Sequence, residues 1–165
     1  MLAQAFPRAR FVGYDAFSPN IIKAQANSQA AGVTDRVRFI RHNASQELPE
    51  RYDIILSFDT LHHAINVLGF MRAIRESLNP NGIFVCKEAA CADTLEANIG
   101  PGGAIAYASG VLVCVPQVLS ESDEALGVAG LPFSKMRELC AQAGFGNARL
   151  VHLEDSSNNL YEIKL

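Results

Sequence analysis

The stretch Phe11-Val-Gly-Tyr-Asp15-Ala-Phe-Ser-Pro-Asn20 decides the fold class of this chain. It is a short apolar segment that ends in an acid, Asp15, and is followed at once by the expected start of a helix. Ser18 is the predicted N-cap, and Pro19 suits the first helical position, where its missing N–H costs nothing. This order is typical of α/β domains in which the acid accepts hydrogen bonds from ribose hydroxyls. The alternative is an acid that only caps the turn.

The rest of the chain alternates between expected strands and helices. Further strands are predicted at 37–41, 52–58 and 83–86, and helices at 19–31, 65–78 and 131–143. The segment 52–58, YDIILSF, has a continuously apolar core, so we expect it to be buried on both faces near the sheet centre. A turn is expected at 79–82, because it contains Asn-Pro-Asn-Gly.

The C-terminal end predicts a hairpin. Strands are expected near 148–153 and 159–165, and residues 154–158 are too few for a parallel crossover. The predicted fold class is therefore α/β, a three-layer Rossmann-like sheet that is mostly parallel with a C-terminal antiparallel hairpin.

Composition limits the function classes. The chain has 165 residues, 49% of them apolar and 19% charged, which predicts one folded domain over 1–165. A net charge of −3 and the lack of a basic run argue against nucleic-acid and membrane surfaces. The four cysteines have no zinc or disulfide spacing, so we expect reduced, mostly buried thiols, no metal site and a cytoplasmic location. The apolar segment 104–118 contains Ser109, Gly110 and Pro116, and it is expected to be too short and interrupted to span a bilayer.

In the order and spacing of these segments, the chain resembles the class I S-adenosylmethionine-dependent methyltransferases. The similar segments are FVGYDAFSPNII, VRFIRHNA, YDIILSFDTLHH, LNPNGIFVCKE and LCAQAGF with the hairpin after it. The resemblance implies transfer of a methyl group from S-adenosylmethionine to an oxygen, nitrogen or carbon of a small molecule, with S-adenosylhomocysteine as product. The segments NIGPGGAIAYASGVLVC and LGVAGLP resemble a subgroup with small-molecule substrates and an N-terminal winged-helix domain.

The resemblance also implies roles for residues at two strand ends. Asp15, with Ala16 beside it, matches the acid that binds both ribose hydroxyls. Asn43 matches a position that faces the adenine amino group, and Ala44 would lie against the adenine ring. Asn43 could equally be a loop residue that bonds its own backbone.

Asp59, His62 and His63 follow the strand 52–58, where the methyl acceptor would meet the cofactor. Asp59 is predicted to contact the cofactor, and a neutral His62 or His63 can take a proton from a hydroxyl. Positioning alone could instead carry most of the rate. In that alternative His63 packs on the next helix and His62 faces water. Gly100–Gly103 follows no clear strand, so it is expected to be a turn before a helix on the substrate side rather than a phosphate loop.

The resemblance starts at the family's second strand, and the first strand and its glycine-rich loop have no counterpart. Apolar edges of 10–15 and 52–58 should then be exposed and prone to pairing. The chain could be a fragment or truncated relative, could complete its sheet as a homodimer or with a partner chain, or could be a degenerate non-catalytic binding module. An isolated monomer is expected to bind S-adenosylmethionine weakly. A nicotinamide oxidoreductase is disfavoured by the terminal hairpin and the lack of a Tyr-x-x-x-Lys pair.

Overall fold

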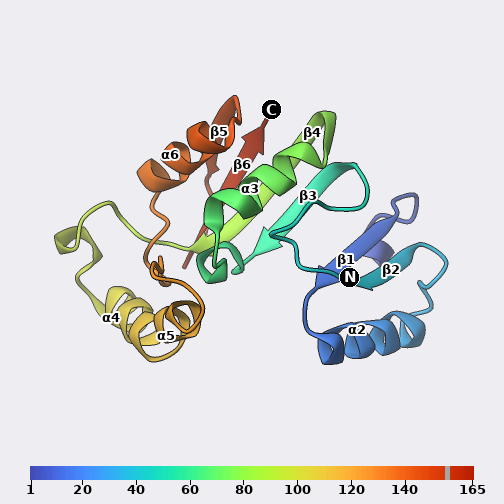
Figure 1. The fold of residues 1–165 in the computed structure, drawn as a ribbon, viewed down its shortest axis with the longest axis horizontal. Helices are drawn as coiled ribbons and strands as arrows, with labels where there is room; N and C mark the ends of the chain where they lie inside the picture. The colour runs from blue at the N-terminus through green and yellow to red at the C-terminus, as the bar shows by residue number, and fades with distance from the viewer. Residues whose placement is uncertain (155–156) are drawn as a thin grey trace. The chain divides into compact units, whose positions relative to one another are not determined.

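The structure is a computed structural model that describes residues 1–154 and 157–165 (Figure 1). The chain divides into two compact units, Met1–Ala44 and Ser45–Leu165, and each unit is described by itself. The predicted organisation as one domain stays a prediction.

The first unit is a two-stranded parallel sheet with a long helix. Its elements are α1 (Leu2–Ala5), β1 (Phe11–Asp15), α2 (Ser18–Ala30) and β2 (Val37–Arg41). Strands β1 and β2 run in register from Phe11 opposite Val37 to Asp15 opposite Arg41, so both end at the same edge. The connection through α2 thus has the strand–helix–strand form that the sequence predicts.

The start of α2 differs from its prediction in one residue. Phe17 is the N-cap, Ser18 and Pro19 are the first two helical residues, and no side-chain cap bond is made by the N-cap. The predicted N-cap role of Ser18 is therefore wrong. The carboxylate of Asp15 instead accepts a hydrogen bond from the Phe17 N–H, with 2.7 Å between the nitrogen and the oxygen. Gly32 follows the helix with φ +65°, a left-handed geometry that glycine adopts without strain.

The second unit contains a four-stranded mixed sheet. Its elements are β3 (Tyr52–Phe58), η1 (Leu61–His63), α3 (Val67–Glu76), β4 (Leu78–Ala89), η2 (Glu96–Asn98), α4 (Pro101–Ser109), the π-helix η3 (Gly110–Cys114), α5 (Val115–Leu119), α6 (Phe133–Ala143), β5 (Asn147–Val151) and β6 (Asn158–Lys164). The strand order is β3-β4-β6-β5. Strands β3 and β4 are parallel, whereas β6 is antiparallel to both β4 and β5. The α/β class with a C-terminal antiparallel hairpin is confirmed; part of the predicted connection, residues 155 and 156, lies outside the described residues.

Strand β4 is longer than predicted. It begins at Leu78 and continues through 79–82, so the turn predicted there is wrong. The pairing passes from Tyr52 opposite Leu78 to Ile54 opposite Ile83, which makes 79–82 an irregularity within the strand. The pairing on both sides keeps these turn-forming residues inside a bulged strand.

The two faces of the four-stranded sheet differ in burial. Helices α3 and α6 pack together over one face (Figure 1). Phe84 of β4 is fully buried there, whereas Ile54, Leu56 and Phe58 of β3 are 59%, 41% and 48% exposed. The expectation that 52–58 is buried on both faces is therefore wrong. Strand β3 has one neighbouring strand among the described residues, β4, so its other edge is unpaired there, as expected. The exposed side chains of Ile54, Leu56 and Phe58 are a separate feature, on the face of the sheet that α3 and α6 leave uncovered.

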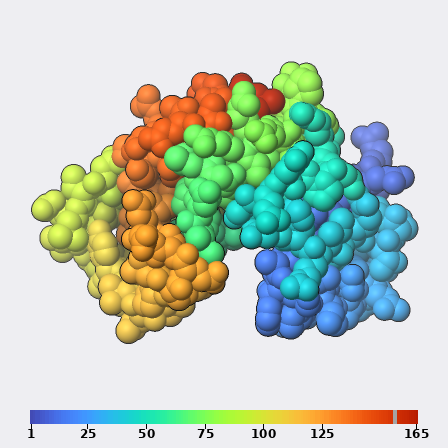
Figure 2. Space-filling model, viewed as in Figure 1, coloured from blue at the N-terminus to red at the C-terminus, as the bar shows by residue number. Residues whose placement is uncertain are grey.

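Residues 101–119 form an uninterrupted helical run, in which α4, η3 and α5 follow one another directly. Ser109, Gly110 and Pro116, which interrupt the apolar sequence, do not interrupt this helical run. Gly110 has helical angles, and Pro116 lies in the first turn of α5, after the π-helical segment, where a proline is tolerated. By length and composition alone, Pro101–Leu119 is sufficient to cross a membrane, which also corrects the expected length limit. Most of the run is at the surface of the second unit, in yellow and orange in Figure 2.

A surface ion-pair cluster on the hairpin gives a first prediction. Arg149 holds Glu162 with two hydrogen bonds, of 3.0 and 2.9 Å, and Lys164 lies 3.1 Å away. The bonds from Arg149 and then Lys164 lower the pKa of Glu162 from 4.5 to about 2. This contribution to stability is present above the ordinary pKa and is lost as pH falls from about 4.5 towards 2. A carboxyl-carbon NMR titration should give this low pKa, and Arg149→Gln should raise it; an unchanged pKa in that variant would contradict the pairing.

Candidate functional site

Asp15 ends β1 and organises the turn into α2. One carboxylate oxygen accepts the Phe17 N–H at 2.7 Å and the other accepts the Asn20 side-chain amide at 2.9 Å. The capping geometry is thus present. A carboxylate has about four lone-pair positions, so these two bonds leave room for two ribose hydroxyls at the partly exposed group.

The other residues predicted to bind adenosine lie at the same edge of the first unit. Ala16 follows Asp15 and is exposed, and Asn43 and Ala44 follow the end of β2. The His42 N–H donates to the Asp15 carbonyl at 3.0 Å, which continues the pairing just beyond the strand ends. The structure therefore brings Asp15, Ala16, Asn43 and Ala44 to one sheet edge.

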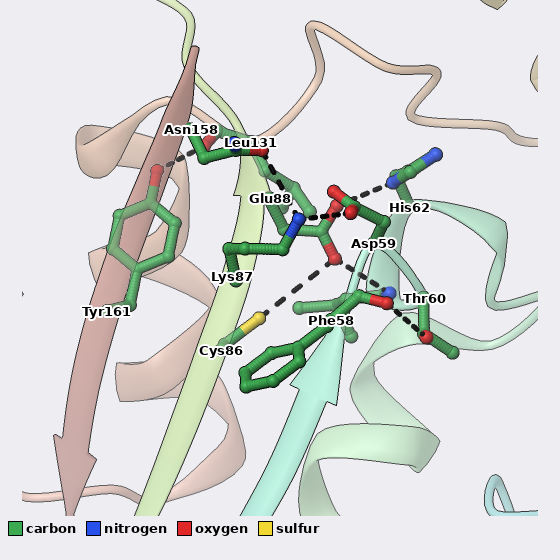
Figure 3. A network of polar contacts seen from close by, with 11 residues as sticks. Phe58, Asp59, Thr60, His62, Cys86, Lys87, Glu88, Leu131, Asn158 and Tyr161 are labelled. Atoms are coloured by element: carbon green, nitrogen blue, oxygen red, sulfur yellow. Dashed lines mark hydrogen bonds and ion pairs between the residues drawn. The ribbon is translucent and has the colours of Figure 1, made fainter. Parts of the chain in front are cut away.

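A buried acid and histidine lie at the end of β3 and β4 in the second unit (Figure 3). One Glu88 oxygen lies 2.5 Å from Nδ1 of His62, and the other accepts the Leu61 N–H at 2.8 Å. Glu88 is fully buried and His62 is 5% exposed. The alternative in which His62 faces water is therefore wrong.

The local sequence explains how this pair forms. Along β4, alternate side chains point to the helix-covered face, so Glu88 continues the buried series of Phe84 and Cys86. Strands β3 and β4 are parallel, with Phe58 opposite Lys87, so the η1 turn after β3 meets the end of β4. A contact of 2.5 Å needs one proton between the two atoms. When Nδ1 carries that proton, Nε2 of His62 has a free lone pair that can accept another.

His63 is a second imidazole beside this pair. Its ring centroid is 4.1 Å from that of His62, and its Nδ1 is buried without a hydrogen-bond partner in the described structure. Burial, and secondarily the neighbouring His62, lowers the pKa of His63, so the ring is neutral near neutral pH. Cys114 of the π-helix joins them: the ligand atoms of His62, His63 and Cys114 all lie within 4.8 Å of one another, an arrangement that could hold a metal ion.

Asp59 belongs to a separate polar group. Its carboxylate pairs with Lys87, which also lies 3.4 Å from the Asn158 side-chain oxygen (Figure 3). Asp59 has φ +51°, an uncommon geometry for a residue other than glycine, which the bond from its N–H to the Lys87 carbonyl at 2.8 Å helps to hold. A cofactor contact by Asp59 would have to share this carboxylate with Lys87.

A pocket of about 500 Å³ begins directly after Glu88, with Ala89 and Ala90 in its wall. The other described lining residues are small or apolar, with few polar groups and no charged side chain among them: Cys91, Ala97, Asn98, Ile99, Gly100, Gly102, Gly103, Ile105, Ala106, Ser109, Val128, Ala129 and Ser157. Its volume is within the range of small-molecule sites.

The predicted turn at Gly100–Gly103 is the start of α4. A Cβ atom on Gly103 would lie 1.7 Å from the Asn98 carbonyl oxygen, so this glycine allows a close backbone approach. At Gly102, by contrast, the space for a Cβ is open. The segment therefore serves helix packing and lines the pocket.

Sequence reasoning missed Glu88 and Lys87. A signal was present: both follow the apolar run 83–86 directly, at the carboxyl end of a buried strand, where ligand sites in α/β sheets form. The approach of Cys114 to the histidines had no such signal, because it depends on how the helical run 101–119 folds back.

The strand–helix–strand unit and the mixed four-stranded sheet define a protein of the α/β class. A family model described as "Methyltransferase domain" matches residues 1–84, about half of the chain. The chain belongs to this family and is a class I S-adenosylmethionine-dependent methyltransferase domain.

Two curated relatives are ubiquinone biosynthesis O-methyltransferases. The protein of Azorhizobium caulinodans is 38% identical over 80 residues, which cover 47% of this chain and 30% of that protein. The protein of Cereibacter sphaeroides is 31% identical over 78 residues, which cover 47% and 32%. The aligned part of the chain thus spans about a third of these relatives.

Solved structures agree in fold. A mitomycin 7-O-methyltransferase has a TM-score of 0.74 at 17% identity, over 99% of this chain and 44% of that one. An O-methyltransferase from neocarzinostatin biosynthesis, solved with S-adenosylhomocysteine and 1,4-dihydroxy-2-naphthoic acid, has a TM-score of 0.70 at 17% identity, over 99% and 44%. At this level of identity, the likeness establishes the fold alone.

Proposed function

We propose that this domain transfers a methyl group from S-adenosylmethionine to an oxygen atom of a small molecule. The observation that carries the proposal is the buried His62–Glu88 pair at the carboxyl ends of β3 and β4. The pocket whose lining begins at Ala89, the residue after Glu88 in the sequence, has no charged side chain among its described residues, which supports a small, neutral acceptor. The relatives named as O-methyltransferases support oxygen as the acceptor atom.

In this proposal, His62 handles the proton of the acceptor hydroxyl. Glu88 accepts the hydrogen bond from Nδ1–H of His62, which fixes the tautomer with its lone pair on Nε2. Nε2 would take the proton of the acceptor hydroxyl, which leaves the acceptor oxygen as the nucleophile. The cofactor, when bound, supplies an electrophilic methyl group on a sulfonium, and S-adenosylhomocysteine is the leaving product.

The strand-end residues of the first unit fit the adenosine part of the cofactor. Asp15 retains acceptor capacity beyond its two local bonds, as two ribose hydroxyls require. Asn43 and Ala44, at the same edge, are proposed to meet the adenine, with Ala16 next to the ribose. Asp59 is proposed as a further cofactor contact and His63 as a second catalytic histidine.

Calorimetric titration with S-adenosylhomocysteine tests the cofactor site. Asp15→Ala should weaken binding by about 10-fold or more, because a hydrogen bond to a charged group contributes about 1.5–3 kcal/mol. Asp35→Ala is the matched control: Asp35 is an exposed acid in the same unit that pairs with Arg36 at 3.0 Å. Circular dichroism checks that the Asp15 variant still folds.

A wild-type chain that binds no S-adenosylhomocysteine at any protein concentration would contradict the enzymatic proposal. The non-catalytic binding module would then be the better description. Equal affinity of the wild type and Asp15→Ala would remove Asp15 from the site while leaving the family assignment intact.

We also propose that the sheet is completed by a second copy or a partner chain, and that the protein is cytoplasmic. The first point is supported by the unpaired edge of β3, whose one neighbouring strand among the described residues is β4, and by the exposed apolar side chains of Ile54, Leu56 and Phe58 on the same strand. The free cysteines, Cys86, Cys91, Cys114 and Cys140, support the second point, because thiols stay reduced in the cytosol.

A further inference from the structure

We propose that His62, His63 and Cys114 bind one Zn²⁺ ion. The three residues come from two elements about 50 positions apart, the η1 turn and the end of the π-helix, and their ligand atoms lie within 4.8 Å of one another. His62 is 5% and Cys114 6% exposed, and His63 is half-buried. Two imidazoles and a thiol thus lie close together at a site that largely excludes solvent, where polar atoms need hydrogen-bond or metal partners.

The Gln117 side chain is a hydrogen-bond partner of the His63 ring, but the bonds around the cluster still leave one nitrogen of each histidine for a metal. Nδ1 of His63 is buried and has no hydrogen-bond partner in the described structure. In the tautomer set by Glu88, Nδ1 of His62 is engaged and Nε2 is the available atom. A carboxylate that orients a histidine through its second nitrogen is the usual outer partner of a metal-bound imidazole.

The donor set selects the kind of metal. Imidazole nitrogen and thiolate sulfur suit Zn²⁺ and other borderline or soft ions, whereas Mg²⁺ and Ca²⁺ prefer oxygen. Ligands at 2.0–2.3 Å from a tetrahedral Zn²⁺ are about 3.5 Å apart, so the side chains must approach one another by about 1 Å. Three protein ligands leave the fourth position for water or another small ligand.

Zinc at this place would stop the proposed reaction. The ion would occupy Nε2 of His62, the atom that is proposed to accept the hydroxyl proton. This inhibitory consequence rests on the proposed function, whereas the binding itself does not.

The experiment measures binding first and activity separately. Equilibrium dialysis of the reduced chain with ZnCl₂ should give one Zn²⁺ per chain. Titration with Co²⁺ should give the near-ultraviolet charge-transfer band of a thiolate–cobalt bond. Cys114→Ser should remove this band, and His63→Asn should weaken binding at least 10-fold; Cys140→Ser, which changes a buried thiol on α6 outside the cluster, is the matched control. Glu88→Gln should weaken binding about 10- to 100-fold.

The outcomes separate the two proposals. Failure of the wild type to bind Zn²⁺, or Co²⁺ binding without a thiolate band, overturns the zinc site regardless of how the variants fold. A band that persists in folded Cys114→Ser also overturns it. Zinc binding without any methyl transfer in the metal-free chain counts against the proposed function only. Methyl transfer that Zn²⁺ inhibits and a chelator restores supports both.

Discussion

Glu88→Gln is expected to lower kcat for methyl transfer by about 100-fold or more, because general-base catalysis contributes about 10²–10⁴-fold. The amide has one acceptor oxygen for two donors, the Leu61 N–H and Nδ1–H of His62, and its NH2 group favours the opposite tautomer of the ring. The ring thus loses the orientation and tautomer that leave Nε2 free. His62→Gln removes the base itself and should lower kcat by at least the same factor. Affinity for S-adenosylhomocysteine should stay within a few-fold, since the cofactor residues proposed in the first unit are unchanged.

The double variant gives the sharper measurement. Glu88 is proposed to act through His62. The kcat of the double variant, Glu88→Gln with His62→Gln, should therefore be no lower than that of His62→Gln alone, and the two losses in kcat should not add. Glu162→Gln is the matched control, since it makes the same chemical change on β6 at an exposed ion pair. Full activity of Glu88→Gln, or additive losses in the double variant, would leave positioning of the acceptor as the main source of rate.

The elements of the fold were predictable where a local pattern determines them. The predicted strands 37–41 and 52–58 match β2 and β3, because each is a short run rich in apolar residues and bounded by turn residues. The C-terminal hairpin was predictable because the connection between its two strands is too short for a parallel crossover. Helix α6 ends at Gly144 in left-handed geometry, as its glycine indicates.

The site was less predictable, because it depends on which strands are neighbours. A histidine pair after β3 was visible in the sequence, but its acid partner is on β4, and only the parallel register of these strands brings Glu88 to His62. Burial of 52–58 was mispredicted for a related reason. An apolar strand pattern does not say which other elements cover it, and here α3 and α6 cover one face while the side chains of Ile54 and Phe58 lie on the other.

This difference between the two sheet faces leads to the second large expected effect. Phe84 is fully buried on the covered face, where its ring lies 6.3 Å from that of Phe145. Phe84→Ala should reduce the free energy of unfolding by about 3–5 kcal/mol, through lost burial and the cavity that remains. Phe58→Ala makes the same change on the neighbouring strand, at a side chain that is 48% exposed, and should cost less than about 1 kcal/mol. Urea unfolding at low protein concentration measures both.

The loss of stability in Phe58→Ala should also depend on protein concentration. If a second copy covers Ile54, Leu56 and Phe58, the wild type gains stability as its concentration rises, because association stabilises the folded state by mass action. Phe58→Ala would then cost little in dilute solution and several-fold more in concentrated solution, whereas the cost of Phe84→Ala would stay constant. A cost for Phe58→Ala that equals that of Phe84→Ala at every concentration would contradict the one-sided burial of this sheet, because it would require a cover from within the same chain.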